Sequence, residues 1–146
     1  YYSALKDATA EPVLKQICTK IAADEFRHYK LFYEQMRRCL ARDRLSRLAR
    51  LRIGWGRLAE SEDDELAYAY FAANEPADAV YDRMRSMQAY ARRAYPLYRE
   101  SHVQRAMAMM LKAVGLQPQG RLNGWLTRAG LWFLRRNASK YAALGA

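Results

Sequence analysis

The segment from Glu11 to Leu40 constrains the fold of this chain most, because its apolar residues recur at intervals of three and four. That spacing places them on one face of a single long helix. The opposite face is rich in lysine and arginine. A helix of this length buries its apolar face only against other helices, so the segment favours a helical bundle. The predicted face comprises Leu14, Ile17, Cys18, Ile21, Glu25, His28, Phe32, Met36 and Cys39.

The remainder of the chain is predicted to be helical as well. Seven glycines and four prolines occur in 146 residues, and no segment alternates in the way that strands do. Residues 1–7 resemble the end of a helix that begins upstream. The chain is therefore predicted to be all-α. Further helices are expected at residues 45–74, 77–95, 97–114 and 122–144.

Four residues mark the expected boundaries of these helices. Thr9 is the predicted N-cap of the long helix, and Ser61 is an N-cap if the 45–74 helix divides. Pro96 is expected to kink or break its helix, and Gly115 to end the next one at the C′ position. The apolar stripes predicted for these later helices include Leu48, Leu66, Val80, Met84, Met87, Tyr90, Ala91, Ala94, Leu122, Trp125, Trp132 and Phe133.

Cysteine usage indicates a reducing compartment. Cys18 and Cys39 lie on the same predicted helix, ~30 Å apart at 1.5 Å per residue, which is too far for a disulfide. Two free thiols are typical of the cytoplasm, and Cys18 is predicted to be a small core residue. No apolar run approaches the ~20 residues that a membrane span requires, and the first residues do not resemble a secretory signal.

The net charge of +10 is concentrated in two segments. Residues 42–57 carry six arginines and one acid, and residues 120–146 carry basic side chains and no acid. Such faces bind an anionic membrane or an acidic partner, and a solvated surface is the alternative. The last helix has the profile of a basic amphipathic helix, either interfacial or packed on its own bundle. Nucleic acid is the least favoured partner, because no recognised binding motif is present.

Glu25 and His28 form the clearest candidate site. Residues at i and i+3 project from the same face of a helix, so this carboxylate and imidazole are oriented to bind one metal centre. A carboxylate on an apolar face costs several kcal/mol unless it is paired, protonated or ligated. The alternative is that Glu25 pairs with an arginine and that His28 is an ordinary core histidine.

The segment EPVLKQICTKIAADEFRHYKLFYEQM resembles the second metal-binding helix of the ferritin-like superfamily. It is most similar to the rubrerythrin-like and acyl-carrier-protein-desaturase-like diiron carboxylate proteins. YYSALKDAT is similar to the end of the preceding helix, so the resemblance covers about the first 40 residues. It implies a ferritin-like helical bundle, N-terminally incomplete, with extra C-terminal helices. The matching residues are Glu11-Pro12, Ile21-Ala22, Asp24-Glu25 and Arg27-His28.

This resemblance assigns roles to four residues. Glu25 would be the bridging carboxylate and His28 the terminal imidazole of one ion. Asp24 would accept a hydrogen bond from a histidine of the partner helix, and Arg27 would form a structural ion pair. A complete site would hold two iron ions, with manganese as the alternative. It would use O₂ or peroxide, as an oxidoreductase or an iron-binding protein; the residues that would act catalytically are unknown.

The other ligands are expected upstream of Tyr1. The second histidine, His102, lies two residues after Glu100, and residues at i and i+2 do not share a helical face. Alternatively, the family relationship persists without a working site. A third option is a homo-oligomer in which two chains each supply half a site, joined by Glu62 or Glu65.

These observations together predict one helical domain over residues 1–146. Its parts are a metal-helix region at 1–40, further bundle helices at 41–119, and a peripheral basic amphipathic helix at 120–146. The leading interpretation is a cytoplasmic diiron carboxylate protein, with Tyr29 and Tyr33 as candidates to lie near the metal. The alternative is a non-catalytic interaction protein, or a membrane-peripheral one, on a ferritin-like scaffold.

Overall fold

The computed structural model describes residues 1–43, 45–60 and 64–143. All regular secondary structure in these ranges is helical, which confirms the predicted all-α class. The elements are α1 (Tyr2–Ala8), α2 (Pro12–Asp43), α3 (Arg47–Glu60), α4 (Asp64–Asn74), α5 (Arg83–Ala94), the 3₁₀ turn η1 (Tyr95–Leu97), α6 (Glu100–Ala113) and α7 (Arg121–Ala143).

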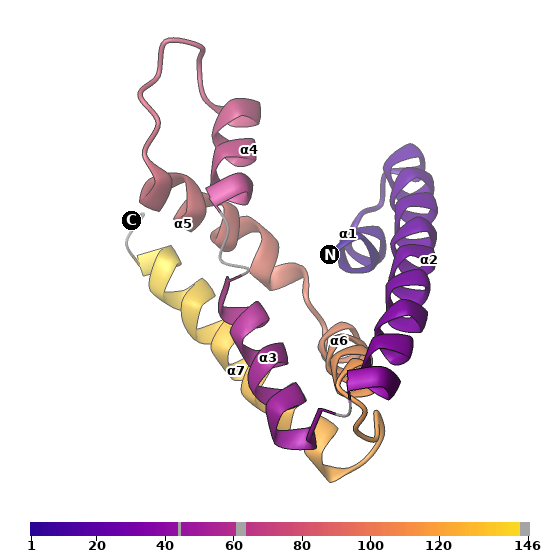
Figure 1. Ribbon diagram of the computed structural model, residues 1–146. Coiled ribbons are helices and arrows are strands. Elements are labelled where there is room, and N and C mark those ends of the chain that lie inside the picture. The colour runs from indigo at the N-terminus through magenta and orange to yellow at the C-terminus, as the bar shows by residue number, and fades with distance from the viewer. Residues whose placement is uncertain (44, 61–63, 144–146) are drawn as a thin grey trace.

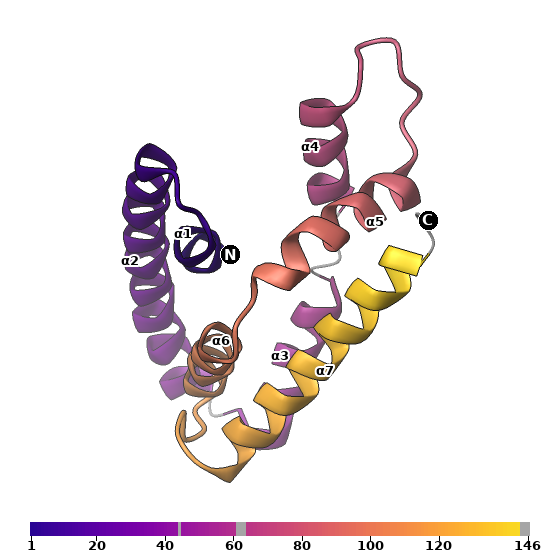
Figure 2. The same cartoon turned by 180° about the vertical axis from the view of Figure 1, so that it is seen from behind.

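The helices form two arms of a V (Figures 1 and 2). Helices α1 and α2 pack together in one arm, and α4, α5 and α7 pack in sequence in the other. Helix α6 packs against both α2 and α7, so it joins the arms. The rings of Tyr1, which directly precedes α1, and Tyr90 of α5 also meet, with centroids 6.3 Å apart.

Glu11, and not Thr9, caps the start of α2. The backbone N–H of Val13 donates to the Glu11 carboxylate at 3.0 Å, and the N–H of Leu14 donates to its other oxygen. These two bonds lower the pKa of Glu11. The Thr9 hydroxyl accepts from the N–H of Glu11 at 3.2 Å. The predicted cap is wrong by two residues, because two carboxylate oxygens satisfy two backbone donors where one hydroxyl would satisfy one.

Only part of the predicted apolar face of α2 packs against other helices. Cys18 is buried, as predicted, and Tyr29 and Tyr33 are partly covered. Ile17 and Phe32, also on the predicted face, are 48% and 70% exposed. The predicted face is therefore only partly correct, because α1 and α6 both approach α2 along the line of Cys18 and Tyr29.

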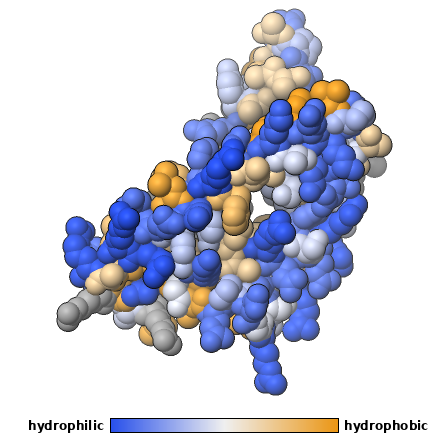
Figure 3. Space-filling view, turned by 90° about the vertical axis from the view of Figure 1, so that its right-hand side faces the viewer, coloured by the Kyte–Doolittle hydropathy of each residue, from blue (hydrophilic) through white to orange (hydrophobic). Residues whose placement is uncertain are grey.

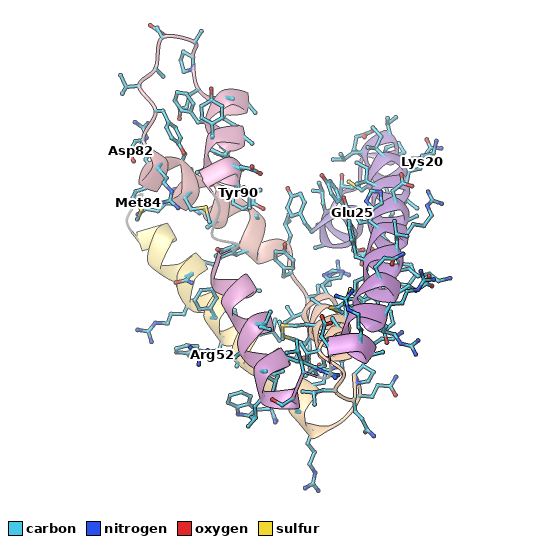
Figure 4. All side chains as sticks on the ribbon, in the orientation of Figure 1. Lys20, Glu25, Arg52, Asp82, Met84 and Tyr90 are labelled. Atoms are coloured by element: carbon cyan, nitrogen blue, oxygen red, sulfur yellow. The ribbon has the colours of Figure 1, made fainter. Side chains whose placement is uncertain are left out.

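Helix α5 begins at Arg83, well after the predicted start at residue 77. The Asp82 carboxylate accepts from the N–H of Arg85 at 3.0 Å and sets the boundary. Val80 lies outside the helix and is 92% exposed. Met84 is exposed as well (Figure 4), so the predicted stripe is wrong at both positions. The rest of that stripe is correct: Ala91 and Ala94 are buried, and burial raises the pKa of Tyr90 to about 12.

The predicted 45–74 helix corresponds to α3 and α4. The expected cap at Ser61 lies outside the described residues. Leu48 and Leu66 are exposed, so the predicted stripe is wrong at both positions, whereas Ala67 is buried. In the part of the chain that the structure describes, α3 packs only weakly against other helices, and its residues Leu48 and Leu51 are exposed.

The boundaries around α6 agree with the sequence predictions. Pro96 lies in the 3₁₀ turn between α5 and α6. Gly115 has a φ of 78° and follows the last helical turn. Its N–H donates to the carbonyl of Lys112 at 3.1 Å, and the N–H of Leu116 donates to that of Leu111 at 2.8 Å. This pair of bonds is the Schellman motif that ends many helices.

Helix α7 packs through a small and polar face, opposite to its predicted apolar face. Asn123, Thr127 and Leu131 are buried. The Thr127 hydroxyl donates to the Asn123 side chain at 3.0 Å, so these buried polar groups satisfy each other. At Gly130, an added Cβ would lie 3.1 Å from Val103 of α6. The small side chains on this face permit a close approach that bulky aromatic side chains would prevent.

We expect Gly115→Ala to lower the free energy of unfolding by about 1–2 kcal/mol, because a positive φ is unfavourable for residues with a Cβ. Urea unfolding followed by circular dichroism measures this. The control is Gly56→Ala inside α3, where an added Cβ meets nothing within 4 Å. That variant is expected to be neutral or up to about 1 kcal/mol more stable. Equal stability of the Gly115 variant and the parent would contradict the assigned C′ role.

Candidate metal centre

Glu25 and His28 lie together in the middle of α2, as the sequence predicts. Oε2 of Glu25 is 3.8 Å from Nδ1 of His28. The Glu25 side chain projects on the side of α2 that is turned toward α1 (Figure 4). Glu25 therefore lies on the side of α2 that packs against α1.

Both members of the pair are accessible to water. The side chains of Glu25 and His28 are 61% and 64% exposed. The expectation that they lie within a buried apolar face is therefore wrong, because the helices packed on α2 leave the side chains of Glu25 and His28 open to solvent. Water solvates the carboxylate in this state, so burial creates no need for a metal here.

Asp24 and Arg27 form an ion pair with each other on the surface of α2. The guanidinium of Arg27 donates to Oδ1 of Asp24, one turn away. The ion pair that the resemblance implies for Arg27 is thus present, within its own helix. Both side chains are more than half exposed, and such pairs contribute little to stability. Asp24 accepts this hydrogen bond in place of one from a histidine.

The pair fits a metal as half of a site. Two ligand atoms that each lie ~2.0–2.2 Å from the same ion are about 3 Å from each other. Oε2 of Glu25 and Nδ1 of His28 are 3.8 Å apart, and rotation of these exposed side chains would bring them to that distance. Within the described ranges, no group of three or more His, Cys, Asp or Glu residues is placed to hold a metal ion. Glu62 lies outside those ranges. Any further ligands must come from residues that the structure does not describe or from another chain.

His102 has a structural role that links α6 to α1. Its Nδ1 accepts from the N–H of Arg99 at 3.1 Å, so Nε2 carries the proton and donates to Oδ2 of Asp7 at 2.9 Å. The Arg99 guanidinium also donates to the backbone carbonyl of Asp7 at 3.0 Å. Both ring nitrogens of His102 therefore have hydrogen-bond partners within the protein. The sequence shows no signal of this link, because its partners are far apart in the chain.

Tyr29 and Tyr33 pack against α6. The Tyr29 hydroxyl donates to the carbonyl of Met109 at 3.0 Å, and burial raises the pKa of Tyr29. The two tyrosine rings stack with centroids 5.9 Å apart, and the Lys112 ammonium lies 4.8 Å from the centre of the Tyr33 ring. These contacts hold α2 to the rest of the molecule.

Comparison with protein-family models, curated proteins and solved structures gives no match to this chain. The ferritin-like resemblance therefore remains a prediction from the residues of α2. Both cysteines are free, one buried and one exposed. Over the residues that are described, no helix combines the length and the apolar character that crossing a membrane requires.

We expect Asp7→Ala to lower the melting temperature at pH 7, because it removes the acceptor of the His102 hydrogen bond. That bond, and then the one with Lys6, holds the pKa of Asp7 below its usual range. A carboxylate with a lowered folded-state pKa stabilises the fold above its unfolded pKa of about 3.9. The stabilisation disappears as the pH falls through the folded-state pKa.

Melting curves of both proteins between pH 2 and 7 measure this effect. The difference in melting temperature should narrow below about pH 4. The control, Asp78→Ala, removes an exposed carboxylate from the loop before α5 and should melt like the parent. A difference between Asp7→Ala and the parent that is independent of pH would show that the charge of Asp7 plays no part.

Proposed function

We propose that Glu25 and His28 are one half of a ferritin-like dinuclear metal site. The observation that carries this proposal is their setting on an uncovered apolar flank of α2. Ile17 lies about three turns before His28 on this flank and Phe32 about one turn after it, and both are exposed. A surface of this kind becomes covered when its partner helices are in place.

The total exposed area supports the view that parts of this surface are normally covered. The chain exposes 11183 Å², whereas a compact monomer of 17.0 kDa exposes about 7,700 Å². The side of the molecule shown in Figure 3 is mostly hydrophilic, with separate hydrophobic patches between the charged groups. Covering the flank of α2 would bury Glu25 and His28, and a buried carboxylate requires a proton, a cation or a metal.

Carboxylate and imidazole donors suit iron, with manganese as the alternative. Glu25 would bridge two ions and His28 would bind one of them, while the remaining carboxylates and the second histidine would come from covering helices. The Asp24 carboxylate would then accept a hydrogen bond from a histidine of those helices in place of the one from Arg27. Bound iron would supply the reduction of O₂ or peroxide, and the chain's own residues would bind and orient the ions.

We expect Glu25→Ala and His28→Ala each to weaken metal binding by at least about tenfold, because each removes a direct ligand. Isothermal titration with Mn(II), and with Fe(II) under anaerobic conditions, measures the affinity. The matched control is Glu34→Ala, an exposed carboxylate elsewhere on α2. Unchanged affinity in both site variants, or an equal loss in the control, would exclude the proposed half-site.

The competing function is a non-catalytic interaction protein on a helical scaffold of the same type. One observation favours it: water already solvates Glu25 and His28, so their charges require no metal in this state. Metal analysis of the protein purified from its own cells separates the two functions. About two ions of iron or manganese for each complete site support the enzyme or iron-binding function, and none supports the scaffold.

A further inference from the structure

The side of α7 that faces away from the other helices carries large apolar side chains. We call this the outer face of α7 and define it by Leu122, Trp125, Trp132 and Phe133, which are between 47% and 61% exposed. It lies opposite the packed face that contains Asn123, Thr127 and Leu131. The four side chains that define the outer face span residues 122–133 of α7, which is about 17 Å along the helix axis.

A row of arginines borders this outer face. Arg121, Arg128 and Arg135 recur every seven residues, which aligns them along one side of the helix. Arg136 lies within the outer face, with its guanidinium 5.1 Å from the centre of the Trp132 ring. Residues 121–143 contain no acid. The face therefore combines apolar and cationic groups without a compensating charge on the same helix.

Two shallow hollows lie between this arginine row and the start of α6. One, of about 480 Å³, is lined by Arg128, Arg135 and Trp132, among others. The other, of about 550 Å³, is lined by Arg121, Arg128 and Trp125, among others. Both are open to solvent, and Glu100 is the one acid among the described residues that line them. Each hollow thus brings at least two guanidinium groups and an indole ring together around a space open to solvent.

We propose that the outer face of α7 binds the surface of a membrane that contains anionic phospholipids. Trp125 and Trp132 would enter the boundary between headgroups and acyl chains, where indole rings partition preferentially. The arginines would bind headgroup phosphates at the hollows, since a guanidinium pairs with phosphate oxygens through two hydrogen bonds. The helix would lie flat, in the manner of interfacial amphipathic helices.

The apolar outer face favours a membrane over other polyanions. A nucleic acid or an acidic protein would satisfy the arginine row but would leave the leucine, tryptophans and phenylalanine of this face in water. An anionic membrane covers both kinds of side chain at once. This inference does not rest on the proposed metal site, because α2 contributes no residue to the outer face of α7.

Sedimentation with lipid vesicles tests the proposal on the intact chain. One set of vesicles is phosphatidylcholine alone, and the other contains about one third phosphatidylserine, an anionic lipid. We expect binding to the anionic vesicles only, and weaker binding as salt screens the charges. A blue shift of tryptophan fluorescence should accompany binding, because the indole rings leave water.

Two variants separate the charged contribution from the apolar one. Arg121→Gln/Arg128→Gln/Arg135→Gln should weaken binding on the order of a hundredfold, at roughly fivefold for each arginine. Trp125→Ala/Trp132→Ala should weaken it on the order of tenfold and remove the fluorescence shift. The charge-matched control, Arg38→Gln/Arg92→Gln/Arg105→Gln, changes three exposed arginines on α2, α5 and α6 and should bind within about twofold of the parent. Circular dichroism verifies that every variant is folded.

Three outcomes would overturn the proposal. The first is equal binding to both kinds of vesicle, or an equal loss in the triple variant and its control. The second is binding to RNA that the triple variant loses, without vesicle binding, which would assign the arginine row to a polyanion. The third is a dimer in light scattering that the tryptophan variant converts to a monomer without a change in vesicle binding. That result would assign the outer face to contact between copies of the chain.

Discussion

The arrangement of this protein depends on contacts at both ends of α6. At its start, His102 donates to Asp7 and Arg99 donates to the carbonyl of the same residue, which fixes α1. Near its end, the carbonyl of Met109 accepts from Tyr29, which fixes α2. The other side of α6 meets α7, closely enough that Val103 lies against Gly130. One short helix therefore determines how the arm that carries Glu25 and His28 is oriented.

The buried side chains along these contacts are mostly small. Small residues let helix axes approach closely, but they remove little apolar area from water. The larger apolar side chains of α2 and α7, among them Phe32 and Trp125, lie outside these contacts. The two proposals arise from this division: the flank of α2 and the outer face of α7 are two places where large exposed apolar side chains adjoin charged groups or the proposed metal ligands. The buried apolar residues are Ala4, Cys18, Ala67, Ala91, Ala94, Val103, Leu111 and Leu131.

Local chemistry made some boundaries predictable and left others ambiguous. Gly115 and Pro96 act through their own backbone geometry, so their effects follow from the sequence. Thr9 and Glu11 both have capping side chains, and three-dimensional geometry decides between them. The face that each helix buries was predicted less well, because spacing identifies an apolar stripe without identifying the helix that will cover it.

By itself, the sequence determined that this chain is helical and that Glu25 and His28 share one side of α2, since both follow from 3.6 residues per turn. Only the tertiary structure decided that the pair is solvated, that His102 bonds to Asp7, and that α7 packs through Asn123 and Thr127. The physical reason is that helix formation depends on neighbouring residues. Burial depends instead on which surfaces, distant in the chain, approach most closely, and here the small and polar faces do so.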